Sequence, residues 1–172
     1  QMCGIIAAIA KRDVAELLLD GLAKLEYRGY DSAGIAVGMG QDLSVLKKVG
    51  KVSELCAAYA EQDASDWRGA VGIGHTRWAT HGEVNEANAH PHRAGDVVLV
   101  HNGIIENHGL LRDELRAHGV KFESTTDSEV IAQLITFELK TETDFKAAVV
   151  NAANKLQGAF AIAVMCARFP NQ

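Results

Sequence analysis

Apolar residues near the start of the chain follow first a continuous and then a helical pattern. The segment Cys3 to Ala10 is short and almost entirely apolar, which is typical of a buried strand. From Val14 to Leu25, apolar residues recur at helical spacing and predict a helix. Asp13 is the expected N-cap of this helix, and Gly29 is expected just beyond its end.

The next part of the chain predicts a hairpin followed by a helix. Residues 33–37 and 43–49 have strand composition, and Gly38 to Asp42 between them carries a turn signal. Val52 to Tyr59 predicts a short helix. The change from strand to helical spacing shows that the chain mixes both kinds of element.

A long polar segment separates two further strand patterns. Residues 70–75 and 97–101 predict strands, and Thr76 to Asp96 between them is rich in His, Gly and Asn. We expect this segment to be a functional loop, because loops of that length are uncommon in compact domains unless they carry a site.

The second half of the chain is mainly helical. Apolar residues predict helices around residues 110–118, 130–135 and 145–156, followed by an apolar strand from Ala159 to Cys166. A strand this apolar requires cover on both faces. Few residues follow it, so we expect the fold to be truncated at its C-terminal end.

The order of the elements indicates the fold class. Strands cluster as hairpins and helices are grouped, which favours a layered α+β fold over a doubly wound parallel sheet. No internal repeat or linker divides the chain, so we expect one domain over residues 1–172.

Composition and charge exclude several function classes. Hydrophobic residues make up 48% and charged residues 23% of the chain, as in ordinary globular proteins. The net charge is −5, and no run of Lys and Arg could follow a nucleic-acid backbone. No apolar run is long enough for a membrane span. Three widely spaced cysteines form no disulfide framework, so we expect a reduced, cytoplasmic protein.

Cys3 is the first candidate for chemistry. A cysteine this close to a chain start could act as a nucleophile that uses its own α-amino group as the base. The pKa of an α-amino group is about 8, so the neutral amine is accessible near pH 7. The alternative is a small buried hydrophobic residue, because free cysteine is among the most buried residue types.

A second cluster, His75 to Gly82, opens the polar segment. Arg77 offers a planar fork that matches a carboxylate, and Thr80 and His81 add hydrogen-bonding groups. Trp78 could close over a site. The alternative is a surface loop with a salt bridge and one anchoring tryptophan.

Two further candidates lie at the end of a predicted strand and at the start of a predicted helix. The side chain of Asn102 and the N–H group of Gly103 could form an oxyanion hole, although an Asn-Gly turn is the common alternative. Asp127 could bind an ammonium group at a helix start, where Thr126 and Glu129 fit a capping box.

The remaining charged and histidine residues suggest structural roles. Arg28 and Asp31 flank a glycine turn and could form a buried ion pair that braces the site. His90 and His92 are too close together for the usual helical pair of zinc ligands, and no cysteine pair supports them. We therefore expect no metal and no cofactor.

Six segments of the chain stand out together, namely Cys3 to Ile6, Tyr27 to Gly34, His75 to Gly82, Asn88 to His92, His101 to Asn107 and Thr126 to Glu129. In this order they resemble the glutaminase domains of the glutamine–fructose-6-phosphate aminotransferase family, a branch of the class II glutamine amidotransferases. The resemblance covers essentially the whole chain. Two related groups, the amidophosphoribosyltransferases and the glutamine-dependent asparagine synthetases, share the Cys-Gly-Ile start and an Asn-Gly element. Residues 27–34 and 75–82 are more similar to the branch that makes hexosamines.

The resemblance implies an N-terminal nucleophile hydrolase fold, a four-layer αββα sandwich with antiparallel sheets. It implies that Cys3 attacks the side-chain amide of L-glutamine and forms a thioester, while Asn102 and Gly103 hold the oxyanion. Ammonia then leaves and water releases glutamate. No cofactor is implied.

The resemblance also implies how the substrate is bound. Arg77 would bind the α-carboxylate of glutamine, with Thr80 and His81 beside it. Asp127 would bind the α-ammonium group. Trp78 would lie in the loop that closes the site and gates ammonia transfer.

The chain departs from the family pattern at both ends. Gln1 and Met2 precede Cys3, whose nitrogen is then an amide without basicity, so we expect impaired catalysis. A sugar-phosphate isomerase domain, absent here, would follow in a homo-oligomeric parent. The alternatives are another ammonia acceptor, such as phosphoribosyl pyrophosphate or aspartate, and a non-catalytic binding fragment.

Overall fold

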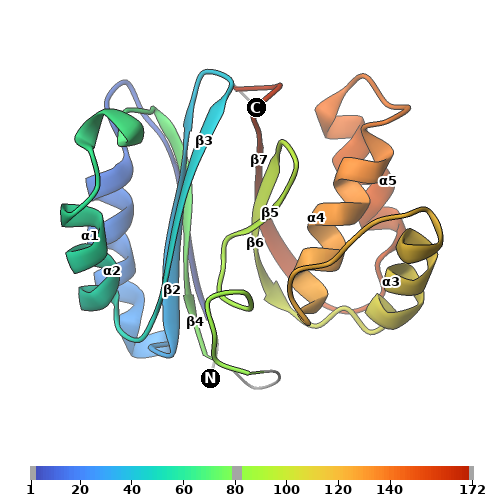
Figure 1. Cartoon of the computed structure of the whole chain (residues 1–172), viewed down its shortest axis with the longest axis horizontal. Coiled ribbons are helices and arrows are strands. Elements are labelled where there is room, and N and C mark those ends of the chain that lie inside the picture. Colours follow the sequence, from blue (N-terminus) through green and yellow to red (C-terminus); the bar gives the residue numbers. More distant parts are fainter. Residues whose placement is uncertain (1–2, 79–82, 171–172) are drawn as a thin grey trace.

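The protein is a four-layer sandwich in which two antiparallel sheets lie face to face between helices (Figure 1). The computed structural model describes residues 3–78 and 83–170. The α+β class and the αββα sandwich expected from the sequence are both confirmed.

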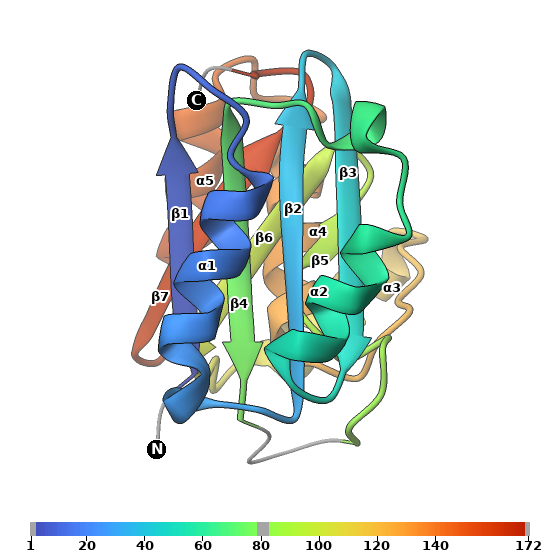
Figure 2. The same ribbon diagram turned by 90° about the vertical axis from the view of Figure 1, so that its left-hand side faces the viewer.

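The first sheet has four antiparallel strands in the order β1-β4-β2-β3. Helices α1 (Ala15–Leu25) and α2 (Val52–Ala60) cover its outer face (Figure 2). Strand β1 is an edge strand, and it pairs with β4 over six residues. The four strands are β1 (Gly4–Ile9), β2 (Ser32–Met39), β3 (Asp42–Val49) and β4 (Val71–Arg77).

The second sheet has three antiparallel strands in the order β5-β6-β7. The later helices lie on its outer side (Figure 1). The strands are β5 (His92–Ala94), β6 (Val97–Gly103) and β7 (Phe160–Cys166). The helices are α3 (His108–Ala117), α4 (Asp127–Glu138) and α5 (Phe145–Lys155).

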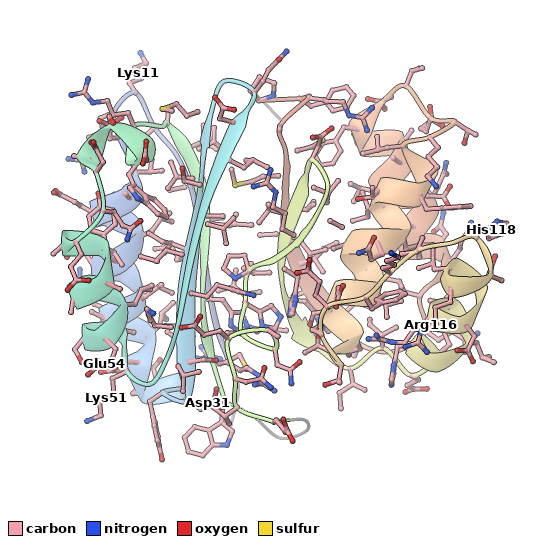
Figure 3. The ribbon with its side chains drawn as sticks, in the orientation of Figure 1. Lys11, Asp31, Lys51, Glu54, Arg116 and His118 are labelled. Atoms are coloured by element: carbon pink, nitrogen blue, oxygen red, sulfur yellow. The ribbon has the colours of Figure 1, made fainter. Side chains whose placement is uncertain are left out.

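Three apolar layers hold the sandwich together. Large side chains such as Leu18 and Leu22 of α1 pack on the first sheet, and Ile131 and Ile135 of α4 pack on the second. Side chains also fill the space between the two sheets (Figure 3). The buried members of that middle layer are Ala36, Ile73, Val98, Val100 and Met165.

The middle layer changes from apolar to polar along its strands. Alternate residues of a strand share one face. On β4, Val71 and Ile73 belong to the apolar middle layer, and His75 continues the same face. On β6, Val98 and Val100 are followed on that face by Asn102. The polar continuation of two apolar stripes therefore creates a polar end between the sheets.

The structure confirms the predicted hairpin, the strands at residues 70–75 and 97–101, and the later helices, although their ends are shifted. Asp13 is not the N-cap of α1. That position belongs to Val14, whose N–H donates to the Gly69 carbonyl at 2.9 Å, so a backbone contact takes over the role expected of a side chain.

Three other expectations need correction. The first strand is not buried throughout, because β1 lies at a sheet edge and Ile9 is 78% exposed. The segment Thr76 to Asp96 is not all loop, since β4 extends to Arg77 and β5 lies within it. The last strand lacks full cover on both faces, because Ala161 is exposed.

Two short 3-10 turns, Glu26–Arg28 and Ala64–Trp67, were not expected from the sequence. Among residues 3–78 and 83–170, no helix has the length and apolar character needed to cross a membrane. Within the same residues, no group of three or more His, Cys, Asp or Glu side chains could hold a metal ion.

Candidate active site

A cavity of about 400 Å³ opens at the polar end of the layer between the sheets. Its size falls within the range of about 300–1,000 Å³ that is usual for small-molecule sites. Its walls come from the ends of β4 and β6 and from the start of α4. Six of the predicted site residues line it, namely Cys3, Arg77, Trp78, Asn102, Gly103 and Asp127.

Backbone contacts hold Cys3 in the cavity. The N–H of Trp78 donates to Cys3 Sγ at 3.2 Å, and the Cys3 thiol lies 3.7 Å from the Trp78 carbonyl oxygen. The next residue, Gly4, donates its N–H to Thr76 Oγ1 at 3.2 Å and pairs with Thr76 across β1 and β4. The sulfur is therefore held by the residue that directly follows β4, and Cys3 itself directly precedes β1, the neighbouring strand.

The Asn102 amide lies beside Cys3 at the end of β6. Its Nδ2 donates to the Cys3 carbonyl oxygen at 2.9 Å, and its Oδ1 lies 2.9 Å from His75 Nε2. Gly103 has a φ of 127°, and a Cβ there would lie 2.2 Å from the Ala159 carbonyl oxygen. Only glycine fits this position, because other residues rarely adopt that backbone conformation and the space is occupied.

Opposite charges line the same cavity. The guanidinium of Arg77, a residue that is only 6% exposed, donates from Nη1 to the Glu83 carbonyl at 3.2 Å. Asp127, the first residue of α4, accepts the Ile105 N–H at Oδ2 over 2.9 Å. A cation and an anion in one cavity match the two charged groups of a free α-amino acid.

The loop before α4 is fixed by its own hydrogen bonds. Thr126 Oγ1 accepts the Glu129 N–H at 3.2 Å, as the predicted N-cap requires. The reciprocal half of the capping box is absent. The Glu129 carboxylate instead accepts N–H groups of Glu123 and Ser124 at 2.9 and 2.6 Å, because the chain folds back over it. Asp127 thus projects from a well-ordered turn.

Asn88 connects the two charged walls of the cavity. It is 2% exposed, and its Nδ2 donates to the Glu83 carbonyl at 3.0 Å. Its Oδ1 accepts the backbone N–H and the hydroxyl of Thr125 at 3.1 and 3.3 Å. The Glu83 carbonyl also accepts a hydrogen bond from Arg77. The Asn88 amide therefore links the segment around Arg77 to the turn that carries Asp127.

Four buried histidines lie in or behind the cavity wall. Burial lowers the pKa of His75 to about 4, and it also lowers the pKa of His90 and of His92 well below the usual value. Burial also lowers the pKa of His101, against the opposing charge of Asp127. These rings are therefore neutral at neutral pH, and the opposite charges of the cavity come from Arg77 and Asp127.

The sequence of the cavity-bearing half matches a known domain. The family model described as "Glutamine amidotransferase domain" matches residues 75–169, more than half of the chain. The chain belongs to the glutamine amidotransferase domain family. The matched range contains both charged walls and the Asn102–Gly103 pair, while Cys3 lies before it.

Two curated relatives are similar to the chain over nearly its whole length. Proteins named glutamine–fructose-6-phosphate aminotransferase [isomerizing] are 51% identical over 172 residues in Vibrio vulnificus (strain YJ016) and 53% identical over 171 residues in Escherichia coli (strain K12). Both alignments cover 99% of this chain. The chain spans 28% of the length of these relatives.

Solved structures of the family share the fold. The glutamine phosphoribosylpyrophosphate amidotransferase from B. subtilis is 27% identical, with a TM-score of 0.80 over 95% of this chain and 35% of its own. A class-II glutamine aminotransferase domain protein from Silicibacter pomeroyi, at 16% identity and a TM-score of 0.59, agrees in fold alone. The N-terminal nucleophile type of sandwich that the family resemblance implied is thereby confirmed.

Some predicted site residues of this family member lie elsewhere. Thr80 and His81 fall outside the described residues. Arg28 and Asp31 are both half-buried and are not among the residues that line the cavity, so the ion pair that would brace the site stays a prediction. Asp31 lies at the end of the first sheet (Figure 3) and accepts the Ser32 hydroxyl at 2.9 Å.

Sequence reasoning gave no role to several residues at the site. His75 and Asn88 lie in segments that were singled out, yet their partners Asn102 and Thr125 are distant in sequence. Ser128 Oγ contacts both His90 and His101, at 2.9 and 2.8 Å. The only sequence signal was the concentration of histidines in and around the polar segment.

Proposed function

We propose that this domain hydrolyses the side-chain amide of L-glutamine to glutamate and ammonia, with Cys3 as the nucleophile. The convergence of Cys3, the Asn102–Gly103 pair and two opposite charges in one cavity supports this proposal most directly. Membership of the glutamine amidotransferase domain family supports the same substrate.

The charged walls account for substrate binding. Arg77 binds the α-carboxylate of glutamine through its planar fork, and Asp127 binds the α-ammonium group. Thr80 and His81 are assigned to the carboxylate side by resemblance alone. Trp78, whose ring meets Tyr30 edge-on with centroids 4.9 Å apart, is assigned to closure of the site.

The chemistry needs one nucleophile, one base and two fixed donors. Cys3 Sγ attacks the amide carbon of glutamine, and the thiol proton passes to the α-amino group of Cys3. Asn102 Nδ2 and the Gly103 N–H stabilise the negative oxygen of the tetrahedral intermediate. Cleavage of the C–N bond, with that proton transferred to nitrogen, releases ammonia and leaves a thioester. Water then hydrolyses the thioester to glutamate and regenerates the thiol.

The base is available only when Cys3 has a free amino group. In the given sequence its nitrogen forms a peptide bond with Met2, and an amide nitrogen is not basic. We therefore expect catalysis to require removal of Gln1 and Met2.

Of the possible acceptors of the ammonia, we favour fructose 6-phosphate. It would be bound by a sugar-phosphate isomerase domain of a homo-oligomeric parent protein. The names and the 51% and 53% identities of the relatives support it. The phosphoribosylpyrophosphate amidotransferase is only 27% identical, so an acceptor of that type ranks second.

The test is glutamate release from L-glutamine by the full chain, by a form that begins at Cys3, and by that form with Cys3→Ala. We expect activity only in the form with a free, unsubstituted Cys3. If that form binds glutamine by calorimetry without turnover, the domain is a binding module as it stands. If it does not bind glutamine at all, the assignment of Arg77 and Asp127 is wrong.

A further inference from the structure

One nitrogen of His75 contacts two oxygen atoms. His75 Nε2 lies 3.1 Å from the carbonyl oxygen of His101 and 2.9 Å from Asn102 Oδ1. A backbone carbonyl can only accept a hydrogen bond, so the first contact requires a hydrogen on Nε2. The neutral ring then carries no hydrogen on Nδ1.

The same reasoning fixes the orientation of the Asn102 amide. The two ends of an Asn amide are normally assigned from their partners. On one side the partner is the Nε2–H of His75, which demands the amide oxygen. On the other side it is the carbonyl oxygen of Cys3 at 2.9 Å, which demands the amide nitrogen. Both neighbours agree on a single orientation.

We propose that His75 is a positioning residue that locks the Asn102 amide with its NH₂ group toward Cys3, where the oxyanion develops. This inference rests on the proposed glutaminase function. The NH₂ group has two hydrogens. One goes to the Cys3 carbonyl, and the other serves the oxyanion. A flipped amide would instead present Oδ1, removing a donor and adding repulsion between two oxygens.

The surroundings of His75 suit this role. The side chain is fully buried, and its ring stacks on His90 with centroids 4.0 Å apart and planes inclined by 22°. His90 Nε2 in turn contacts Ser128 Oγ at 2.9 Å. Because the ring is packed and bonded to a backbone carbonyl, its N–H direction is set before substrate arrives.

The first experiment compares His75→Gln with His75→Met in the form that begins at Cys3. Glutamine keeps an N–H donor at a similar reach, and methionine has none. We expect His75→Met to lower kcat about 10- to 100-fold, where the upper value corresponds to the complete loss of one oxyanion donor. The affinity for the substrate glutamine should change less than about twofold. We expect Gln to restore most of the rate. Equal losses in both variants would overturn the proposal, with thermal unfolding confirming that both fold.

A double-mutant cycle separates positioning from general packing. In an Asn102→Ala background, His75→Met should cause no further loss of kcat, because its route to the reaction is gone. Losses that multiply would show that His75 acts independently of Asn102 and would overturn the proposal.

An activity-independent measurement keeps this proposal distinct from the proposed function. In ¹⁵N-histidine-labelled protein, NMR at pH 7 should show the His75 hydrogen on Nε2, with assignment by the His75→Gln variant. A hydrogen on Nδ1 would overturn the positioning role even in an active protein. Absence of glutamate release would overturn the glutaminase function, and the NMR result would still decide the state of His75.

Discussion

The two ends of the layer between the sheets use the same strands for different purposes. At one end Ile73 of β4 packs in a cluster with Val98 and Val100 of β6. At the other end the same faces carry His75 and Asn102, which bond to each other. The backbone pairing is continuous from one end to the other. The difference shows that side-chain choice at every second position, not a change of fold, separates packing from chemistry.

The largest expected effect is the loss of the nucleophile at the polar end. In the form that begins at Cys3, Cys3→Ala should lower glutamate release at least about 10³-fold, because no other thiol lines the cavity among the described residues. Urea unfolding should change little. The control is Cys56→Ala, a half-buried thiol on α2. If both variants lose activity equally, the loss is not specific to the thiol in the cavity, and the assignment of Cys3 as the nucleophile is wrong.

The opposite effect is expected at the apolar end. Ile73→Ala should lower the free energy of unfolding by about 2–5 kcal/mol, because it leaves a cavity in a packed layer. The kcat and KM of the folded protein should stay within about twofold. Urea titration and glutamate release check both quantities. A fall in kcat comparable to that of a site variant would contradict the separation.

Acid should destabilise the protein through the buried histidines at the polar end. Burial lowers the pKa of His75 from 6.5 to about 4, so between these values the unfolded chain binds more protons than the folded chain. The free energy of unfolding should therefore fall as pH drops from 6.5 towards 4, by about 3 kcal/mol for His75 alone. The lowered pKa values of His90 and His92 also make the free energy of unfolding fall as the pH drops.

Urea titrations at pH 7, 6 and 5 measure this loss. His75→Gln should reduce its size, whereas the same change at His118, an exposed residue (Figure 3), should leave it unaltered. Equal pH dependence in all three proteins would show that acid acts elsewhere.

The smallest expected effect concerns the link between the charged walls. Asn88→Ala should weaken glutamine binding about tenfold, equivalent to about 1.4 kcal/mol, because Thr125 and the Glu83 carbonyl lose a buried partner. The kcat should change only a few-fold. Isothermal calorimetry provides the measurement, and Glu86→Ala in the same segment is the control. A larger effect on kcat than on binding would assign Asn88 to the chemistry instead.

Sequence patterns predicted those parts of the fold that depend on local chemistry. The turn around Gly40, the N-cap at Thr126 and the strand β7 all have short-range causes. Strand β5 was missed because three residues give no periodic signal, and it exists through pairing with β6. Asp13 was chosen as a cap by residue type, but a carbonyl of Gly69 decided the position.

The candidate site divides in the same way. Cys3, Arg77, Asn102 and Asp127 were recognised from their own functional groups. The contacts that hold them were not, because His75 reaches Asn102 across 27 residues and Asn88 reaches Thr125 across 37. The first contact follows from the facing of two sheets and the second from the packing of two segments that lie outside the strands. Neither leaves a local pattern in the chain.

Strand β6 has a consequence for insertions and deletions. Its consecutive residues His101 and Asn102 face opposite sides, toward Ser128 of α4 and toward Cys3. Deleting one residue between Val97 and Val100 would exchange these sides, so that Asn102 would turn away from Cys3 and Gly103 would take its place in the strand. A scan of single-residue deletions should therefore find β6 intolerant, while the turn at Gly40 and Gln41 accepts length changes. The register of this strand, more than its composition, keeps the Asn102 amide in the cavity.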